Sequence, residues 1–320
     1  MVGVIGAPVR HSLSPRLHNA AFAALGLDWA YLAFPVAPDQ VGAALAAVLA
    51  LGLAGLNVTM PHKAAVVPLC DRISPTVEAL GAANTLVARD GELAAESTDG
   101  PGFLDALRTG HGFRPEGRRA LVVGAGGAAR AVILALAGAG ASEVVVVNRT
   151  RARAEAAAAL AGTAGRVGEP AEADGADLVV NATPLGMDLR SPPPGVLDRA
   201  SVPASRPRHA GPPRPEHAGP PGPEHAGPPR PDHAGPPGPE SPFPADPVLP
   251  VPADRLGPGQ LVVDLVYHPP CTPFLEAAAA RGAVTANGVG MLVHQAARSF
   301  SLWTGLDPPV EAMLRAARLL

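Results

Sequence analysis

The stretch LVVGAGGAARAVILALAGAGASEVVVVNRT at residues 121–150 decides the fold of this chain. It contains an apolar strand pattern, a glycine-rich turn, an apolar helix pattern and a second apolar strand pattern that ends at Asn148. This order is typical of the βαβ unit of nucleotide-binding proteins. Strand and helix patterns also alternate on both sides of this unit, which predicts an α/β protein with largely parallel sheets.

The other expected elements follow from apolar periodicity and turn residues. Ser14 is expected to be the N-cap of a helix with Pro15 at its first position, because serine accepts hydrogen bonds from the first turn. A hairpin is expected around Asp90 and Gly91 within residues 84–96. Further strands are expected at 2–6, 29–34, 55–59, 176–181 and 260–267, and helices at 14–25, 39–51, 272–281, 289–303 and 308–319.

The glycine-rich turn is expected to bind a dinucleotide. It fits the pattern GxGxxG/A, directly after an apolar strand and directly before a helix. Glycines permit a tight turn and let backbone amides approach a pyrophosphate, and the helix N-terminus adds partial positive charge. The residues expected to contact the cofactor here are Gly124, Ala125, Gly126, Gly127, Ala128 and Ala129.

The end of the second strand indicates which dinucleotide is bound. A site for NAD usually carries an acidic residue near this point, which holds the ribose 2′-hydroxyl. This chain has NRT followed by more arginines, and a guanidinium can grip a 2′-phosphate that a carboxylate would repel. The sequence therefore predicts NADP(H), although arginines that merely open a solvated helix are an alternative. The residues concerned are Asn148, Arg149, Thr150 and Arg153.

Between the strand patterns at 176–181 and 260–267 the hydrophobic period fails. Residues 191–259 are dominated by proline and glycine, and the octapeptide HAGPP(R/G)P(E/D) repeats over residues 209–240. Such a segment cannot bury a core, so we expect a disordered or polyproline II insertion within the nucleotide-binding domain. The four repeat histidines predict no metal site, because steps of eight residues turn each by about 120° from the last. A docking role for the proline motifs stays open.

Length and charge bound the domains and the partners. A chain of 320 residues is long enough for two domains. We expect a substrate-binding domain from residues 1–99 plus 288–320, a Rossmann-like domain from residues 100–287, and closure of the cleft between them. The net charge of −3 and the absence of long apolar runs predict neither nucleic-acid nor membrane partners. The isolated Cys70 and Cys271, and a start unlike a signal peptide, predict a cytoplasmic protein.

Lys63 is the only lysine among 25 lysine and arginine residues. In a chain biased towards arginine, lysine is expected to survive where arginine cannot replace it. An ammonium is compact and can give up its proton, whereas a guanidinium stays protonated. Lys63 is therefore a candidate for proton-transfer chemistry, and the alternative is a surface lysine left by chance.

Polar residues gather at four places in the first hundred residues. They offer hydroxyls, amides, one ammonium and one carboxylate, which suits a small hydroxylated ligand that carries a carboxylate. Taken singly, Ser14 and Asp99 could be ordinary helix caps and Asn84 an ordinary turn residue. The four clusters are HSLSP at 11–15, NVTMPHK at 57–63, ANT at 83–85 and STDG at 97–100. The histidines expected to be structural are His18, His62 and His294.

These segments, in this order and spacing, closely resemble the shikimate dehydrogenase family. The resemblance covers almost the whole chain outside the insertion, and NVTMPHK and MLVHQAA are quite specific. Ser97 departs from the family, which usually has asparagine there, and the insertion follows the NATPLGM loop. The matching segments are HSLSPRLHNAAF, NVTMPHK, AANT, STDGPGF, GAGGAAR, NRT, NATPLGM, DLVYHPPCTPFL and GVGMLVHQAARSFSLWTG.

The resemblance implies NADPH-dependent, reversible reduction of 3-dehydroshikimate to shikimate, in aromatic amino-acid biosynthesis. It implies that Lys63 and Asp99 flank the reacting oxygen as a proton-transfer pair. The chemistry agrees, because hydride transfer to a ketone builds negative charge on oxygen and needs a proton donor. Which of the two residues holds the transferred proton stays open. Thr183, Leu265 and Gly288 are expected on the cofactor side. The residues expected to hold substrate are Ser12, Ser14, Asn57, Thr59, Asn84, Tyr267 and Gln295, together with the catalytic pair.

Two other functions stay open. A quinate/shikimate dehydrogenase with relaxed cofactor use is the nearest, and an acidic residue after Asn148 would have favoured it. An inactive ligand-binding relative that works through the insertion is the other, and loss of Lys63 or Asp99 would have favoured that. We therefore expect a small-molecule enzyme that uses NADP(H) and no metal, and a homodimer is possible.

Overall fold

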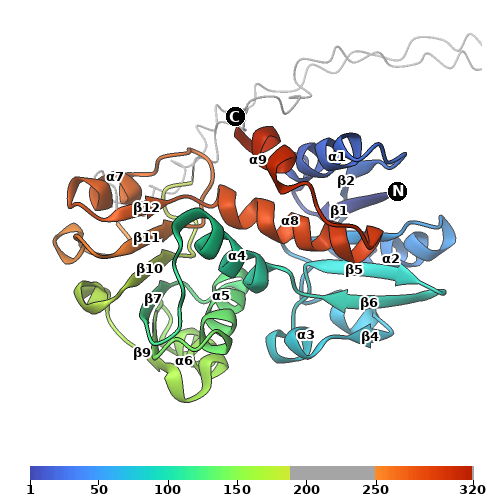
Figure 1. Cartoon of the computed structure of the whole chain (residues 1–320). Helices are drawn as coiled ribbons and strands as arrows, with labels where there is room; N and C mark the ends of the chain where they lie inside the picture. The colour runs from blue at the N-terminus through green and yellow to red at the C-terminus, as the bar shows by residue number, and fades with distance from the viewer. Residues whose placement is uncertain (188–248, 319–320) are drawn as a thin grey trace, which may run out of the picture. The chain divides into compact units, whose positions relative to one another are not determined.

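The computed structural model describes residues 1–187 and 249–318, which belong to one compact unit. The octapeptide repeats at 209–240 lie outside the described residues. The described residues form two six-stranded sheets with accompanying helices, so the predicted α/β class is confirmed (Figure 1). No helix in this part of the chain is long and apolar enough to cross a membrane.

The first sheet is mixed, with the strand order β2–β1–β3–β5–β6–β4. Strand β1 pairs in parallel with β2 and β3, and β5 runs antiparallel to β3 and β6. The β5–β6 pair is the predicted hairpin, with Asp90 at a φ of 55° in its turn. Its strands are β1 (Val2–Gly6), β2 (Tyr31–Pro35), β3 (Gly55–Val58), β4 (Arg72–Ile73), β5 (Thr85–Arg89) and β6 (Glu92–Glu96). The helices along this part are α1 (Ser14–Ala24), η1 (Pro38–Gln40), α2 (Val41–Ala50), η2 (Val67–Leu69) and α3 (Pro75–Leu80).

The second sheet is parallel throughout, with the order β12–β11–β10–β7–β8–β9. The chain runs outwards in one direction from β7 to β9 and in the other from β10 to β12. The switch point therefore lies between β7 and β10, where open α/β sheets bind ligands. Its strands are β7 (Arg119–Val123), β8 (Glu143–Val147), β9 (Gly165–Val167), β10 (Leu178–Asn181), β11 (Leu261–Asp264) and β12 (Val284–Ala286). Its helices are α5 (Gly127–Gly138), α6 (Arg151–Ala158), η3 (Ala159–Ala164), η4 (Pro170–Gly175), η6 (Ala253–Arg255) and α7 (Pro273–Ala280).

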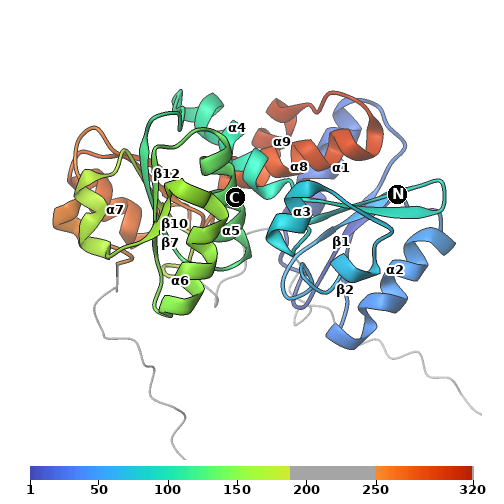
Figure 2. The ribbon, with the colours of Figure 1, turned by 90° about the horizontal axis from the view of Figure 1, so that it is seen from below.

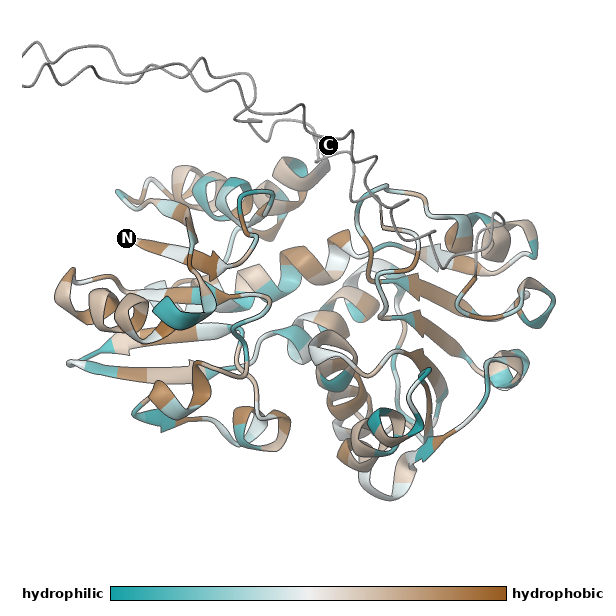
Figure 3. Ribbon diagram, turned by 180° about the vertical axis from the view of Figure 1, so that it is seen from behind, coloured by the Kyte–Doolittle hydropathy of each residue, from teal (hydrophilic) through white to brown (hydrophobic). Residues whose placement is uncertain are grey.

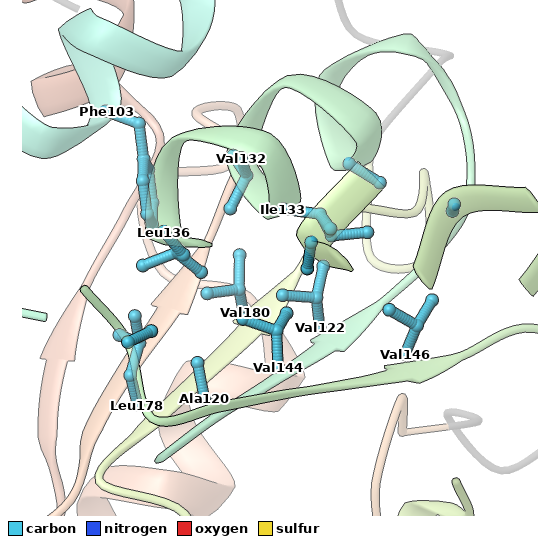
Figure 4. Close-up of a cluster of buried hydrophobic side chains, with 14 of the residues drawn as sticks. Phe103, Ala120, Val122, Val132, Ile133, Leu136, Val144, Val146, Leu178 and Val180 are labelled. Carbon is cyan, nitrogen blue, oxygen red and sulfur yellow. The ribbon is translucent and has the colours of Figure 1, made fainter. Parts of the chain in front are cut away.

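Both faces of this second sheet are buried, which explains its uninterrupted valine runs. Val122 and Val144 point into a core beneath α5, shown in Figure 4, whereas Leu121 and Val145 point into a separate core on the opposite face. The strands accordingly appear as continuous apolar ribbons in Figure 3. Four residues fully buried in this way stabilise the fold by roughly 1.5–3 kcal/mol each.

Three further helices lie beside these sheets: α4 (Asp99–His111), α8 (Val289–Thr304) and α9 (Val310–Arg318). Helix α8 packs against α4, and α9 packs against α1, as Figures 1 and 2 both show. Gly102 permits the first contact, because a Cβ there would lie 2.5 Å from the backbone nitrogen of Gln295. Phe300 of α8 and Met313 of α9 share a buried core with Val2 and Val4 of β1. The last helices therefore pack with the first sheet.

Two predictions of local structure are wrong. Helix α1 begins at Ser14 itself, with Leu13 at the cap position and no side-chain cap, because Ser12 Oγ accepts the hydrogen bond from the Ser14 amide at 3.3 Å. The insertion does not extend to residue 259, because Val251 and Leu256 are buried in the core of the second sheet. Proline-rich composition concealed these two anchoring side chains. The short β4, α3, β9 and β12 were also missed, and β11 ends at Asp264 rather than at residue 267.

Candidate active site

A cavity of about 220 Å³ lies where residues of both sheets and α8 converge. Every residue predicted to hold substrate lines it, and so do three of the predicted cofactor residues. The predicted residues in its wall are Ser12, Ser14, Asn57, Thr59, Lys63, Asn84, Asp99, Tyr267 and Gln295, together with Ala128, Leu265 and Gly288. Val4, Val58, Met291 and Leu292 supply apolar wall. Segments far apart in the sequence thus meet in one place.

Lys63 and Asp99 form an ion pair at this cavity. Lys63 follows β3, and its Nζ donates to Asp99 Oδ2 at 2.5 Å. Asp99 is the first residue of α4, and its other oxygen accepts from Asn84 Nδ2 at 2.8 Å, so the carboxylate is held from two sides. Lys63 keeps 23 % of its side chain exposed and retains two N–H donors for a ligand. The predicted pair therefore exists as a pair, and Asp99 is not merely a helix cap.

Asn84 connects this pair to the rest of the cavity. Its Nδ2 atom has Asp99 Oδ1 and Thr98 Oγ1 at 2.8 Å and Gln295 Oε1 at 3.3 Å. An amide nitrogen carries only two hydrogens, so the longer contact with Gln295 competes poorly. Gln295 Oε1 consequently stays available to accept from a ligand hydroxyl.

Asn57 differs from the other cavity residues. Its Oδ1 accepts from the Tyr31 hydroxyl at 2.7 Å, and its Nδ2 has the Asn84 carbonyl, Thr85 Oγ1 and Ser299 Oγ at 3.0 Å. The side chain is buried and its hydrogen-bonding capacity is used within the protein. It thus supports the cavity wall more than it offers groups to a ligand.

Tyr267 contributes a phenol from the loop after β11. Burial raises its pKa above the usual value, so the hydroxyl stays protonated and can donate a hydrogen bond. The hydroxyls of Ser12, Ser14 and Thr59 line the same cavity. Together these groups offer several hydrogen bonds around one cation, as a small hydroxylated anion requires.

The glycine-rich turn forms an open backbone cradle. Gly124 has a φ of 120°, and a Cβ there would lie 3.0 Å from the Ala182 carbonyl oxygen, so glycine is required. At Gly126 a Cβ would meet no atom within 4 Å, and at Gly127 only the Lys63 side chain, at 3.9 Å. Helix α5 begins at Gly127, so its first amides have no intrahelical partner. Space, free amides and a helix N-terminus together fit a pyrophosphate.

The predicted phosphate-binding residues follow β8. Asn148 Nδ2 donates to the Thr150 carbonyl at 3.0 Å and shapes the turn into α6. Arg149 and Arg153 are exposed and take part in none of the ion pairs found among residues 1–187 and 249–318. Arg151 between them pairs with Glu155 at 2.9 Å. The two unpaired guanidinium groups fit a ribose 2′-phosphate beyond this strand.

A buried carboxylate behind the cofactor side was not predicted. Asp264 at the end of β11 accepts from Asn181 Nδ2 at 3.0 Å and from the Thr272 hydroxyl at 2.7 Å. Burial raises the pKa of Asp264. Asn181 also accepts from the Thr183 hydroxyl at 2.6 Å, so this network orients the loop that carries Thr183. Leu265 follows directly, and its carbonyl leaves no room for a side chain at Gly288.

The three histidines predicted to be structural contact protein groups, although neither ring nitrogen of His18 has a hydrogen-bond partner among the described residues. His18 is fully buried and stacks on Tyr31 with ring centroids 4.4 Å apart, and burial lowers its pKa to about 3. His62 lies 2.8 Å from the Val36 carbonyl oxygen through Nε2. His294 lies 3.0 Å from the Thr109 hydroxyl. None of the three lines the cavity of Lys63 and Asp99.

A larger cavity of about 930 Å³ lies along α4, α8 and α9. It shares Tyr267 and Met291 with the smaller one, but Lys63, Asp99 and Asn84 do not line it. Its wall is mainly apolar. The chemistry-bearing residues therefore select the smaller cavity as the candidate active site.

Comparison with known proteins shows which family this chain belongs to. Three family models match the chain: the shikimate dehydrogenase substrate binding domain at residues 4–86, shikimate/quinate 5-dehydrogenase at 110–183 and the shikimate 5′-dehydrogenase C-terminal domain at 288–318. The shikimate dehydrogenase (NADP(+)) of Citrifermentans bemidjiense is 41 % identical over 327 residues, covering 99 % of this chain and 93 % of the relative. The chain belongs to the shikimate dehydrogenase family.

Solved structures of relatives have the same fold. The shikimate 5-dehydrogenase of Thermus thermophilus, in complex with NADP(H) and shikimate, is 34 % identical with a TM-score of 0.76, over 99 % of this chain and 98 % of that one. The quinate dehydrogenase of Corynebacterium glutamicum, in complex with NAD, is 28 % identical with a TM-score of 0.74, over 100 % and 98 %. The family thus contains both reactions that the sequence left open.

Proposed function

We propose that this protein catalyses the reversible, NADP(H)-dependent reduction of 3-dehydroshikimate to shikimate, a step of aromatic amino-acid biosynthesis. The observation that carries the proposal is the Lys63–Asp99 pair, joined at 2.5 Å in a cavity that also reaches the glycine-rich turn through Ala128. Membership of a family whose curated relatives are NADP(+)-dependent shikimate dehydrogenases supports it.

The substrate is proposed to lie among the polar side chains of the small cavity. Ser12 and Ser14 follow β1, and we propose that they bind the carboxylate through their hydroxyls. Gln295 and Tyr267 are proposed to bind the ring hydroxyls, since Gln295 offers an acceptor and Tyr267 a donor. Asn84 is proposed to bind through the second lone pair of its Oδ1, because Thr98 and Asp99 accept both hydrogens of its amide. The remaining proposed substrate ligands are Thr59 and the catalytic pair, with Asn57 in the supporting wall.

NADP(H) is proposed to lie along the carboxyl ends of β7 and β8. The backbone of residues 124–129 would hold the pyrophosphate, and Arg149 and Arg153 the 2′-phosphate, with Asn148 and Thr150 shaping that turn. Thr183, Leu265 and Gly288 would line the nicotinamide end. The overlap of a Gly288 side chain with the Leu265 carbonyl supports the need for glycine there.

The bound nicotinamide supplies the hydride that reduces the ketone carbon. Lys63 is proposed to stabilise the negative charge that develops on the carbonyl oxygen and to donate the proton that makes the hydroxyl. Asp99 holds the ammonium in place and accepts a hydrogen bond from the hydroxyl in the alcohol state. In the oxidation direction the same pair removes that proton. One ketone, one hydride and one proton thus give one alcohol.

A quinate/shikimate dehydrogenase with relaxed cofactor use is the second candidate. The Corynebacterium glutamicum relative, which binds NAD, supports it. The lack of an acidic residue between Val147 and Glu155 opposes it, because NAD sites usually hold the ribose hydroxyls with a carboxylate. We also propose a cytoplasmic location, because Cys70 and Cys271 are both free thiols. The homodimer stays a prediction.

The test is an absorbance assay of reduced nicotinamide, with shikimate or quinate and with NADP+ or NAD+ at matched concentrations. We expect turnover to be fastest with shikimate and NADP+. The Lys63→Ala variant should lose roughly 10²- to 10⁴-fold in kcat, the usual contribution of a general acid–base group. Faster turnover with quinate and NAD+ would select the second candidate, and wild-type kcat in Lys63→Ala would reject the proposed mechanism.

A further inference from the structure

Three hydroxyl groups meet behind the Lys63–Asp99 pair. Thr85 Oγ1 and Ser299 Oγ lie 2.8 Å apart, and Thr98 Oγ1 lies 3.3 Å from each of them. All three side chains are buried, and none of the three lines the active-site cavity. They come from β5, from the residue before α4 and from α8, so this hydroxyl cluster joins three elements.

The hydroxyl cluster contacts the amides of both asparagines of the candidate site. Asn57 Nδ2 donates to Thr85 Oγ1 and Ser299 Oγ at 3.0 Å, and Asn84 Nδ2 donates to Thr98 Oγ1 at 2.8 Å. The backbone amide of Thr98 donates to Asn84 Oδ1 at 2.7 Å, which fixes which end of the Asn84 amide carries the hydrogens. The second hydrogen of Asn84 Nδ2 therefore points to Asp99 Oδ1.

Two chains of hydrogen bonds end at Ser299: one runs from Asn57 through Thr85, and the other from Asn84 through Thr98. The Ser299 hydroxyl donates to the Gln295 carbonyl at 3.1 Å, one turn earlier in α8. Its oxygen then has two lone pairs for three surrounding donors, Asn57 Nδ2 and the Thr85 and Thr98 hydroxyls. The two threonine oxygens in turn accept from Asn57 and Asn84. Without Ser299, the acceptors left for the Thr85 hydroxyl are Thr98 Oγ1 and Asn84 Oδ1, each 3.3 Å away. One of these two is the contact with Asn84 Oδ1. That contact would compete with the one that orients the Asn84 amide.

We propose that Ser299 is a positioning residue: through Thr85 and Thr98 it orients Asn84, and thereby the Asp99 carboxylate that holds Lys63. The proposal rests on the proposed proton-transfer role of the Lys63–Asp99 pair. It explains why a polar residue occupies a fully buried position on α8, where an unpaired hydroxyl would be costly. The group acts by geometry alone and touches no ligand.

Ser299→Ala and Thr85→Val test the proposal, because each removes one hydroxyl, and valine keeps the shape of threonine. We expect kcat with shikimate and NADP+ to fall about tenfold in each, as for other partners that orient catalytic groups, with a smaller change in KM. The solvent deuterium isotope effect on kcat should rise, since proton transfer becomes slower. Thr85→Ser keeps the hydroxyl and should recover most of the loss.

Ser301→Ala is the matched control. Ser301 lies on the same helix, and its hydroxyl donates only to the Ala297 carbonyl at 3.4 Å, away from the cluster. A kcat within about twofold of wild type in both Ser299→Ala and Thr85→Val, with unchanged thermal midpoints, would overturn the proposal. An equal loss in Thr85→Ser would overturn it too, because packing rather than the hydroxyl would then be responsible. A wild-type kcat in Lys63→Ala would instead reject the proposed proton-transfer mechanism. This result distinguishes failure of the proposed function from failure of the Ser299 proposal.

Discussion

The substrate side and the cofactor side of the candidate site are built from different groups. On the substrate side, Asn57, Asn84 and Asp99 are buried and hydrogen-bonded to one another or to neighbouring side chains. On the cofactor side, residues 124–129 offer mainly backbone amides, and Arg149 is exposed. The side chains on the substrate side are thus held by hydrogen bonds to one another, whereas the cofactor side offers free backbone amides.

This difference follows from what each side must do. Proton transfer requires a charge held in a fixed direction, and fixed side chains lose no energy in reorganising during the reaction. Holding a pyrophosphate requires only free amides and close approach, which glycines provide. We therefore expect substitutions on the substrate side to act on kcat, and substitutions on the cofactor side to act on affinity.

The Arg149→Ala/Arg153→Ala double variant tests the cofactor side. Two charge-assisted contacts to a 2′-phosphate are lost, so the KM for NADP+ should rise by roughly 100-fold. The KM for NAD+ is the internal control, because NAD+ has no 2′-phosphate, and it should change little. Equal changes in the KM for NADP+ and the KM for NAD+, measured by initial rates, would mean that these arginines do not bind the 2′-phosphate.

His18→Phe tests the acid sensitivity of the buried substrate side. Burial lowers the pKa of His18 to about 3, so between pH 3 and 6.5 the unfolded chain binds a proton that the folded chain excludes. Its contribution is complete above pH 6.5 and is lost as the pH falls. Between pH 7 and pH 5 it should account for about 2 kcal/mol of lost stability.

Urea unfolding at the two pH values measures this difference. The loss between pH 7 and pH 5 should be about 2 kcal/mol smaller in His18→Phe than in wild type. His11→Gln is the control, because His11 is exposed on the loop before α1 and should leave the wild-type slope unchanged. The same slope in His18→Phe would show that the buried ring does not set the acid limit.

The features that could be predicted from the sequence are those that depend on a local pattern. The valine runs and GAGGAA predicted β7, α5 and β8, because burial on both faces and the glycine turn each have a sequence signal. Polar residues at strand ends predicted the substrate-side cluster. The carboxyl ends of β1, β3 and β6 and the amino end of the antiparallel β5 lie at one edge of the first sheet. Composition made Lys63 a candidate, and the resemblance paired it with Asp99. The structure joins the two side chains in an ion pair, and the proton-transfer role stays a prediction.

The features that were missed depend on contacts between distant residues. Ser299 lies 214 positions from Thr85 along the chain, and only its place one turn after Gln295 could have suggested that it faces the site. Asp264 lay inside the strand predicted at 260–267, whereas its carboxylate accepts a hydrogen bond from Asn181 Nδ2. Val251 lies in proline-rich sequence that has no hydrophobic period. It is buried because it packs in the core of the second sheet.

A double-mutant cycle of Lys63→Ala and Asp99→Asn tests most directly the claim that these residues act as one unit. Asp105→Asn is the control. Asp105 lies on the same helix as Asp99 and forms an ion pair with Arg298 at 2.7 Å, and neither residue lines the cavity. We predict that each single variant loses roughly 10²- to 10⁴-fold in kcat and that the double variant is no worse than the worse single. Losses that multiply, or wild-type kcat in either single variant, would contradict the account.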